Sequence, residues 1–215
     1  MGTTSADRLD RAFRVPLSSH LFGGAVHGFR RFWVRLGNLE SRVLTDRLQG
    51  IPIDRPIFIA GLARSGTTIL LEALARHPRV VTHRYRDFPP VFTPYWWQEV
   101  LRRGPRVSSE LVERAHGDGL PVGPDSPEAM EEPIWMAFFP EIHTPGRCQV
   151  LDDRTDNPAF ERFYRDHLRK LLLARGGERY LSKGNYNVSR LRYLLKLFPD
   201  ARVVIPVRHP RGHVA

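Results

Sequence analysis

Hydrophobic positions along the chain form two kinds of segment, short continuous runs and longer stretches with helical spacing, and the two kinds alternate. Short apolar runs typical of buried strands occupy residues 56–60, 80–82, 180–183 and 202–207. Apolar residues three and four positions apart predict helices over 67–76, 127–137, 158–175 and 187–198. Strands that alternate with helices favour a parallel sheet. We therefore predict an α/β fold of three layers, with a central parallel sheet flanked by helices on both faces.

Residues with known end preferences mark where two of these helices begin and end. Ser126 followed by Pro127 is typical of a helix start, and so is Asn157 followed by Pro158. Gly176 follows the second helix and is expected to end it, because glycine readily adopts the left-handed conformation found there.

A further helical pattern precedes the first strand, over residues 20–48. Its apolar members are Phe29, Trp33, Leu36, Leu39 and Val43, with arginines largely between them. The pattern fits an amphipathic helix packed on the domain, and it also fits a helix that lies on a membrane surface. We predict an N-terminal helical extension over 1–50 and one α/β domain over 51–215.

Composition restricts the partners and the cellular setting. The 33 Lys and Arg residues exceed the 23 Asp and Glu residues, which gives a net charge of +10 and favours anionic partners such as a phosphorylated cofactor or a membrane surface. The arginines are scattered without a basic, aromatic-interleaved stripe, so we expect no nucleic acid partner. Cys148 is the only cysteine and excludes an internal disulfide. We expect a cytoplasmic protein, with peripheral membrane contact through residues 20–48 as an alternative.

The loop after the first strand carries the clearest chemical signal. The sequence GLARSGTT has the G-x-x-x-x-G outline of a phosphate-binding loop, formed by Gly61 and Gly66, but Thr67 stands where nucleotide triphosphatases have lysine. The cation has moved back to Arg64, inside the loop. Such a loop suits a single 5′-phosphate that carries a small anionic group, without a metal ion. A plain strand-to-helix turn or an ATP-binding loop that has lost its lysine are the alternatives.

RSGTT after an apolar strand, followed by a helix and His77-Pro78, resembles the 5′-phosphosulfate loop of sulfotransferases that use 3′-phosphoadenosine-5′-phosphosulfate (PAPS). The stretch 191–210, LRYLLKLFPDARVVIPVRHP, is similar to the family segment that ends in an arginine for the 3′-phosphate, which would be Arg208. The resemblance implies a P-loop-type domain whose PAPS contacts are Gly61, Arg64, Ser65, Gly66, Thr67, Thr68 and Arg208. Family members place a serine eight positions after this arginine, beyond Ala215, so we expect the domain to be incomplete at its C-terminus.

The same resemblance implies roles in catalysis. Arg64 and Lys183 stand where the family has cations that stabilise the transition state and meet the leaving group. Asp87 lies nearest the family's general base and Glu132, beside Glu131, is the second candidate. Asp87 is flanked by arginines that would lower its pKa, which opposes a base role.

We therefore expect a sulfotransferase that moves a sulfuryl group from PAPS to a hydroxyl or amine of a small-molecule, carbohydrate or lipid acceptor. The alternatives are a P-loop kinase that uses ATP and a non-catalytic nucleotide-binding or membrane-associated module. The histidines lack the spacing of zinc ligands, so no metal site is expected. An aromatic cluster could line an acceptor pocket or simply form core, and it comprises Phe88, Phe92, Tyr95, Trp96 and Trp97.

Overall fold

The computed structural model of the chain describes residues 28–104, 112–113 and 121–209. Its strands are β1 (Ile57–Ala60), β2 (Val80–Val81), β3 (Val112–Glu113), β4 (Pro121–Val122), β5 (Arg179–Gly184) and β6 (Arg202–Val204). Its helices are α3 (Arg30–Val43), α4 (Thr45–Gln49), α5 (Thr67–Ala75), α6 (Pro94–Arg103), α7 (Glu132–Phe138), α8 (Pro158–Arg175) and α9 (Leu191–Leu197). Two short 3₁₀ helices are η1 (Tyr85–Asp87) and η2 (Asn185–Arg190).

The four strands predicted from the apolar runs form one parallel sheet in the order β2-β5-β1-β6. Ile59 of β1 lies opposite Lys183 of β5, and Ile57 lies opposite Arg202 of β6. Because all four strands run in the same direction, the segments that follow them leave from one edge of the sheet. The glycine loop, Lys183 and the segment that contains Arg208 therefore share this edge.

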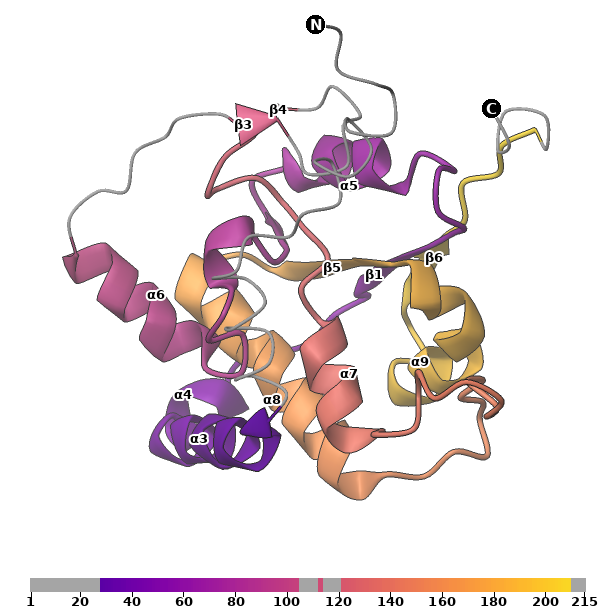
Figure 1. Cartoon of the computed structure of the whole chain (residues 1–215). Coiled ribbons are helices and arrows are strands. Elements are labelled where there is room, and N and C mark those ends of the chain that lie inside the picture. Colours follow the sequence, from indigo (N-terminus) through magenta and orange to yellow (C-terminus); the bar gives the residue numbers. More distant parts are fainter. Residues whose placement is uncertain (1–27, 105–111, 114–120, 210–215) are drawn as a thin grey trace, which may run out of the picture.

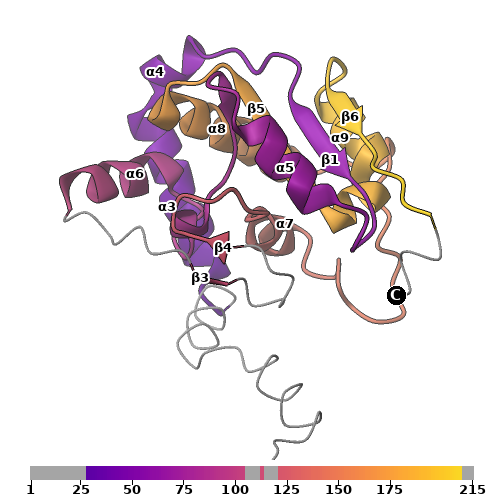
Figure 2. The ribbon, with the colours of Figure 1, turned by 90° about the horizontal axis from the view of Figure 1, so that it is seen from above.

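Helices cover both faces of the sheet, as Figures 1 and 2 show. On one face, α5 packs over Ile59 and Leu181, which are fully buried. On the other face, Phe58 and Tyr180 point into a larger core contributed mainly by α7, α8 and α9. Alternate strand residues point to opposite faces of the sheet. Because helices cover both faces, the strand residues on each face are apolar. The predicted three-layer α/β fold is confirmed.

The end signals predicted one helix accurately and misplaced another. The Asn157 side chain caps α8 by accepting a hydrogen bond from the Phe160 amide at 3.0 Å, and Gly176 ends the helix with φ +66°. The helix predicted over 127–137 begins only at Glu132, where α7 starts. Residues around Pro127 instead run alongside the segment after β2, and the Glu128 amide donates to the His83 carbonyl at 3.0 Å.

The helical pattern before β1 forms α3 and α4, and α3 packs closely against α8. Lys170 Nζ donates to the Gly37 carbonyl at 3.0 Å and pairs with Glu40 at 2.9 Å, and both side chains are fully buried. A Cβ on Gly37 would lie 2.7 Å from the Phe163 ring, which shows how near the two helices approach. Residues 1–27 of the predicted extension lie outside the described residues. No helix among the described residues has the length and apolar character needed to cross a membrane.

Candidate active site

The loop between β1 and α5 turns the chain tightly into the start of a helix. Arg64 and Gly66 both adopt positive φ, at +67° and +92°, which turns the chain tightly into the first turn of α5. The Ser65 amide and hydroxyl both donate to the Leu62 carbonyl, at 3.2 and 2.7 Å. The first turn of a helix leaves backbone amides without intrahelical acceptors, so such a start favours an anion.

Gly61 is required by close packing within this loop. A Cβ at Gly61 would lie 2.8 Å from the Ser65 hydroxyl oxygen, 3.0 Å from Cγ2 of Thr67 and 3.2 Å from Cγ of Pro206. The loop therefore folds back on the strand end and against the segment that follows β6. Ser65 and Thr67 are buried by this arrangement, whereas Arg64 is exposed.

Two cations from other strands approach the loop. Lys183, at the end of β5, donates from Nζ to Thr68 Oγ1 at 3.2 Å, and its side chain is only 8% exposed. Arg208, after β6, donates from Nη1 to the Arg64 backbone carbonyl at 3.1 Å. The sequence-predicted residues Arg64, Thr68, Lys183 and Arg208 are thus brought together at one edge of the sheet.

Glu128 is a residue of this site that sequence reasoning did not single out. Its Oε1 lies 3.6 Å from Lys183 Nζ, and its Oε2 accepts a 2.7 Å hydrogen bond from the Tyr85 hydroxyl. Glu128 belongs to the same run, SPEAMEEP, that contains Glu131 and Glu132. The sequence holds no feature that ranks these three carboxylates, because the ranking depends on where α7 begins.

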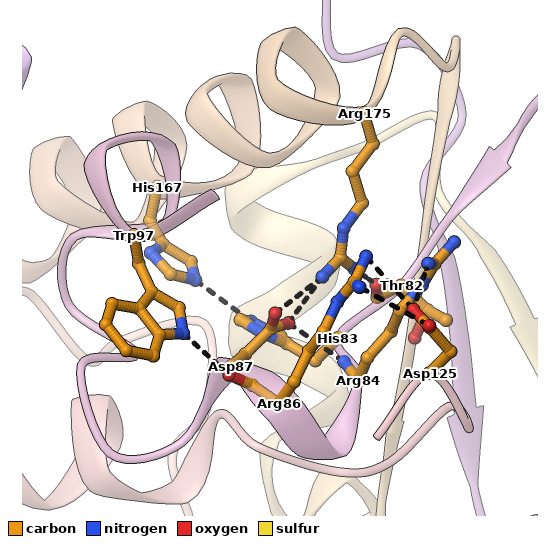
Figure 3. Close-up of polar contacts among 9 residues, drawn as sticks. All are labelled: Thr82, His83, Arg84, Arg86, Asp87, Trp97, Asp125, His167 and Arg175. Carbon is orange, nitrogen blue, oxygen red and sulfur yellow. Dashed lines mark hydrogen bonds and ion pairs between the residues drawn. The ribbon is translucent and has the colours of Figure 1, made fainter. Parts of the chain in front are cut away.

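Asp87, the first candidate for the general base, lies in a buried network that Figure 3 shows. Arg175 from α8 donates to both of its carboxylate oxygens, at 2.6 and 2.8 Å, and also to the Thr82 carbonyl. The Arg84 amide donates to Oδ2 at 2.8 Å, and Nδ1 of His83 lies 3.1 Å from the same oxygen. Asp87 itself is only 4% exposed.

The electrostatics of this network oppose a base role for Asp87. Burial alone would raise the pKa of Asp87, but the hydrogen bond and charge of His83 and the charge of Arg175 outweigh it and lower the pKa to about 2. A carboxylate with so low a pKa is a weak proton acceptor near neutrality. Its contacts link the segment after β2 to α8, so Asp87 stabilises the fold.

His167 extends the same network into the core. Its Nε2 lies 3.0 Å from Nε2 of His83, and its Nδ1 is buried with no hydrogen-bond partner among the residues that the structure describes. Burial lowers the pKa of His167 well below its ordinary value, and the charges of His83, Lys170 and Arg175 act in the same direction. His167 is therefore neutral near pH 7.

Glu132, the second candidate for the base, is also engaged elsewhere. Its two oxygens accept from the guanidinium of Arg190, at 2.6 and 3.0 Å, and Nε2 of His143 lies 2.5 Å from Oε1. Arg190 is 1% exposed and stacks over the Trp135 ring, with 4.5 Å from Cζ to the ring centroid. Glu132 thus pairs with a buried guanidinium, which is a structural contact.

Members of the aromatic cluster mostly have packing partners. Phe92 is fully buried and stacks on Trp33 of α3, with ring centroids 6.4 Å apart. Trp97 Nε1 donates to the Arg86 carbonyl at 2.6 Å, and Arg47 Nη1 donates to the Tyr95 hydroxyl at 2.5 Å. The contacts of these three residues are those of core and interhelical packing.

Comparison with known proteins places this geometry in context. A sequence profile described as the sulfotransferase family matches residues 56–215. Sulfotransferase STF1 from Mycobacterium tuberculosis is a similar solved structure, with a TM-score of 0.56 and 20% identity over 83% of this chain and 53% of that one.

Sulfotransferase STF9 from Mycobacterium avium is a second, with a TM-score of 0.46 and 17% identity over 80% of this chain and 47% of that one. The chain spans about half the length of these two structures. No curated protein matches the sequence significantly.

Proposed function

Because the chain belongs to the sulfotransferase family, we propose that it transfers a sulfuryl group from PAPS to a hydroxyl or amine acceptor. The observation that carries the proposal is the approach of Lys183 to Thr68 and of Arg208 to the Arg64 carbonyl. These contacts put cations from three strand ends around one glycine loop. A donor with anionic groups at two ends of an adenosine suits that arrangement.

The residues present fit the phosphosulfate end of such a donor. Gly61 leaves no room for a side chain, and Gly66 adopts a positive φ that favours glycine. Ser65, Thr67 and Thr68 supply hydroxyls beside the start of α5. In this proposal the amides of the first helical turn and these hydroxyls bind the 5′-phosphate. Arg208 binds the 3′-phosphate from the neighbouring strand end.

Arg64 and Lys183 have the charges that sulfuryl transfer requires. The donor supplies a sulfuryl group attached to a phosphate, which is a good leaving group. Negative charge grows on the bridging oxygen as that bond breaks, so a cation fixed in advance beside it lowers the barrier. Lys183 is suited to this because it is largely buried and already oriented by Thr68. Arg64 is exposed, and we assign it contact with the sulfuryl group and with the bridging oxygen, which remains in PAP as an oxygen of the 5′-phosphate.

Calorimetric titration of the chain with 3′,5′-adenosine bisphosphate (PAP) tests the proposal. We expect micromolar or tighter binding, and a loss of roughly tenfold to a hundredfold in Arg64→Ala and Lys183→Ala, because each removes a charge-assisted hydrogen bond. Arg192→Ala is the matched control, since its side chain is 74% exposed and pairs with Asp153. ATP with Mg²⁺ binding in preference to PAP would favour a kinase instead and overturn the proposal.

Several classes of acceptor are compatible with the proposed reaction. A small molecule, a carbohydrate or a lipid would each present the hydroxyl or amine that the chemistry needs. Radiolabelled PAPS, incubated with phenols, sugars and amino sugars in turn, would identify the class by label transfer. Label transfer to none of them, with PAP bound normally, would favour a non-catalytic nucleotide-binding module.

A further inference from the structure

Glu128 is tied to the same cation that contacts the glycine loop. Lys183 Nζ lies between Thr68 Oγ1, at 3.2 Å, and Glu128 Oε1, at 3.6 Å. The Glu128 side chain is 12% exposed, so it is largely shielded from water without being sealed off. A carboxylate in this position lies beside the cation that is proposed to meet the leaving group.

The backbone around Glu128 fixes this position. The Glu128 amide donates to the His83 carbonyl at 3.0 Å, and Pro127 forms a bridge with Arg84. On the side chain, Oε2 accepts from the Tyr85 hydroxyl at 2.7 Å, and Oε1 accepts from the Ala129 amide at 2.7 Å. The carboxylate is thus oriented before any substrate arrives, as a catalytic group should be.

Three other carboxylates, Asp87, Glu131 and Glu132, have structural partners. Asp87 accepts two hydrogen bonds from the Arg175 guanidinium, and Glu132 accepts two from that of Arg190. Glu131 accepts from the phenols of Tyr164 and Tyr180 in the core. Glu128 differs because its cationic partner is Lys183, which the proposed reaction itself draws toward the leaving group.

We propose that Glu128 is the general base of the reaction, an inference that rests on the proposed sulfotransferase function. One Glu128 oxygen takes the proton of the acceptor hydroxyl or amine as the acceptor atom bonds to sulfur. The bond between sulfur and the bridging phosphate oxygen breaks, and its electron pair stays on that oxygen beside Lys183. The products are the sulfated acceptor, PAP and a protonated Glu128, so charge and atoms balance.

Lys183 then has two roles, one before the donor binds and one after. Before the donor binds, its ammonium neutralises Glu128 and rests on Thr68. When the anionic donor binds, it competes with Glu128 for the same ammonium. The carboxylate that is released becomes a stronger proton acceptor, because an adjacent cation stabilises its ionised form. Donor binding would in this way activate the base.

The reverse reaction, with PAP and an aryl sulfate as probes, tests Glu128 directly. In that direction Glu128 must donate its proton to the departing phenol oxygen. The probes are 4-nitrophenyl sulfate, whose phenolate leaves readily without a proton, and 4-methylphenyl sulfate, whose phenolate needs one. We expect Glu128→Gln to stay within about threefold of the wild type with the nitro ester and to fall by about a hundredfold or more with the methyl ester.

Binding gives a second measurement that does not depend on turnover. Gln keeps an oxygen for Tyr85 and for the Ala129 amide but cannot compete for the Lys183 ammonium. We therefore expect Glu128→Gln to bind PAP at least as tightly as the wild type. Asp125→Asn is the matched control, because Asp125 is an exposed carboxylate that pairs with Arg84 and Arg86. It should leave both rates and the affinity unchanged.

Each other outcome contradicts the inference. Equal loss with the two esters would make Glu128 a positioning residue for Lys183, and no loss with either would remove it from the reaction. A wild-type chain that binds PAP but transfers from neither ester would also count against it. Should Glu128→Gln fail to fold, Glu128→Asp replaces it, with the larger loss again expected for the methyl ester. Absence of PAP binding by the wild type would instead overturn the proposed function itself.

Discussion

Arg208 donates a hydrogen bond to the backbone carbonyl of Arg64 across 144 positions of sequence, with 3.1 Å between Nη1 and the oxygen. The contact joins the segment after β6 to the glycine loop after β1, and it exists because β1 and β6 are parallel neighbours. The two residues proposed to hold opposite ends of one nucleotide therefore lie at the same edge of the sheet. This arrangement leads to the first prediction.

Replacing Arg208 with alanine should remove the preference for a 3′-phosphate. We expect PAP to bind about tenfold to a hundredfold more weakly, because a hydrogen bond to a charged group contributes about 1.5–3 kcal/mol. AMP, which lacks the 3′-phosphate, should bind equally well to both proteins. Calorimetry with the two nucleotides measures the difference, and Arg202→Ala, an exposed arginine on β6, is the control. A parallel loss of affinity for AMP would contradict the assignment.

Replacing Gly61 with alanine should distort the loop more than it destabilises the fold. The added Cβ would lie 2.8 Å from the Ser65 hydroxyl oxygen, closer than such atoms approach. Overpacking of this kind costs about 1–3 kcal/mol, and here the loop rather than the core must yield. We expect at least a tenfold loss of PAP affinity.

Gly50→Ala is the matched control for this substitution, because a Cβ there meets no atom of the described residues within 4 Å. Titration calorimetry and thermal unfolding of both variants separate binding from stability. Unchanged PAP affinity in Gly61→Ala would show that the loop does not bind the nucleotide.

The buried ion pair between Glu40 and Lys170 should behave as a unit. Burial raises the pKa of Glu40 and lowers that of Lys170, and each partner acts against the shift of the other. Lys170→Met alone leaves a buried carboxylate without its cation, which costs about 3–5 kcal/mol of unfolding free energy.

Adding Glu40→Gln to Lys170→Met should recover part of that loss, because the double variant buries no charge at this position. The glutamine oxygen can still accept from the Trp96 amide, which Glu40 does at 2.6 Å. Urea denaturation of the wild type, both single variants and the double variant measures the coupling. A double variant less stable than Lys170→Met would argue against this account.

His167 should make the protein less stable in mild acid. Its pKa is lowered well below 6.5 in the folded state, so below pH 6.5 the unfolded chain binds a proton there that the folded chain does not. Stability therefore falls as the pH decreases, by about 1.4 kcal/mol per pH unit from this group.

His167→Gln should reduce that slope, and urea denaturation between pH 5 and 7.5 measures it. The variant keeps a polar group opposite Nε2 of His83, so we expect only a small loss of unfolding free energy at pH 7.5. Identical slopes in the two proteins would show that His167 is not the titrating group.

Much of the fold followed from local sequence signals. Asn157, Pro158 and Gly176 determined α8, since capping depends only on residues near each helix end. The apolar runs predicted the four sheet strands, because strands covered on both faces are apolar throughout. The glycine loop was equally readable, since few other motifs place two glycines and a row of hydroxyls between a strand and a helix.

Long-range pairing could not be predicted in the same way. The flanking arginines suggested a low pKa for Asp87, but the partner that holds it, Arg175, lies 88 positions away on α8. Glu128 was not among the predicted site residues, because the helix predicted from Pro127 would have placed it on the first helical turn, away from Lys183. Its contact with Lys183 depends on α7 beginning five residues later, at Glu132, which tertiary packing decides.

The residues proposed to bind the donor and the residue proposed as the base come from different parts of the chain. The first lie at or after the ends of the parallel strands β1, β5 and β6. Everything assigned to gripping the donor comes from three neighbouring strand ends, whose spacing the backbone fixes. Glu128 and Tyr85 come from the long excursion between β2 and α8, outside that framework. The excursion can therefore be rebuilt for a different acceptor while the donor cradle stays as it is.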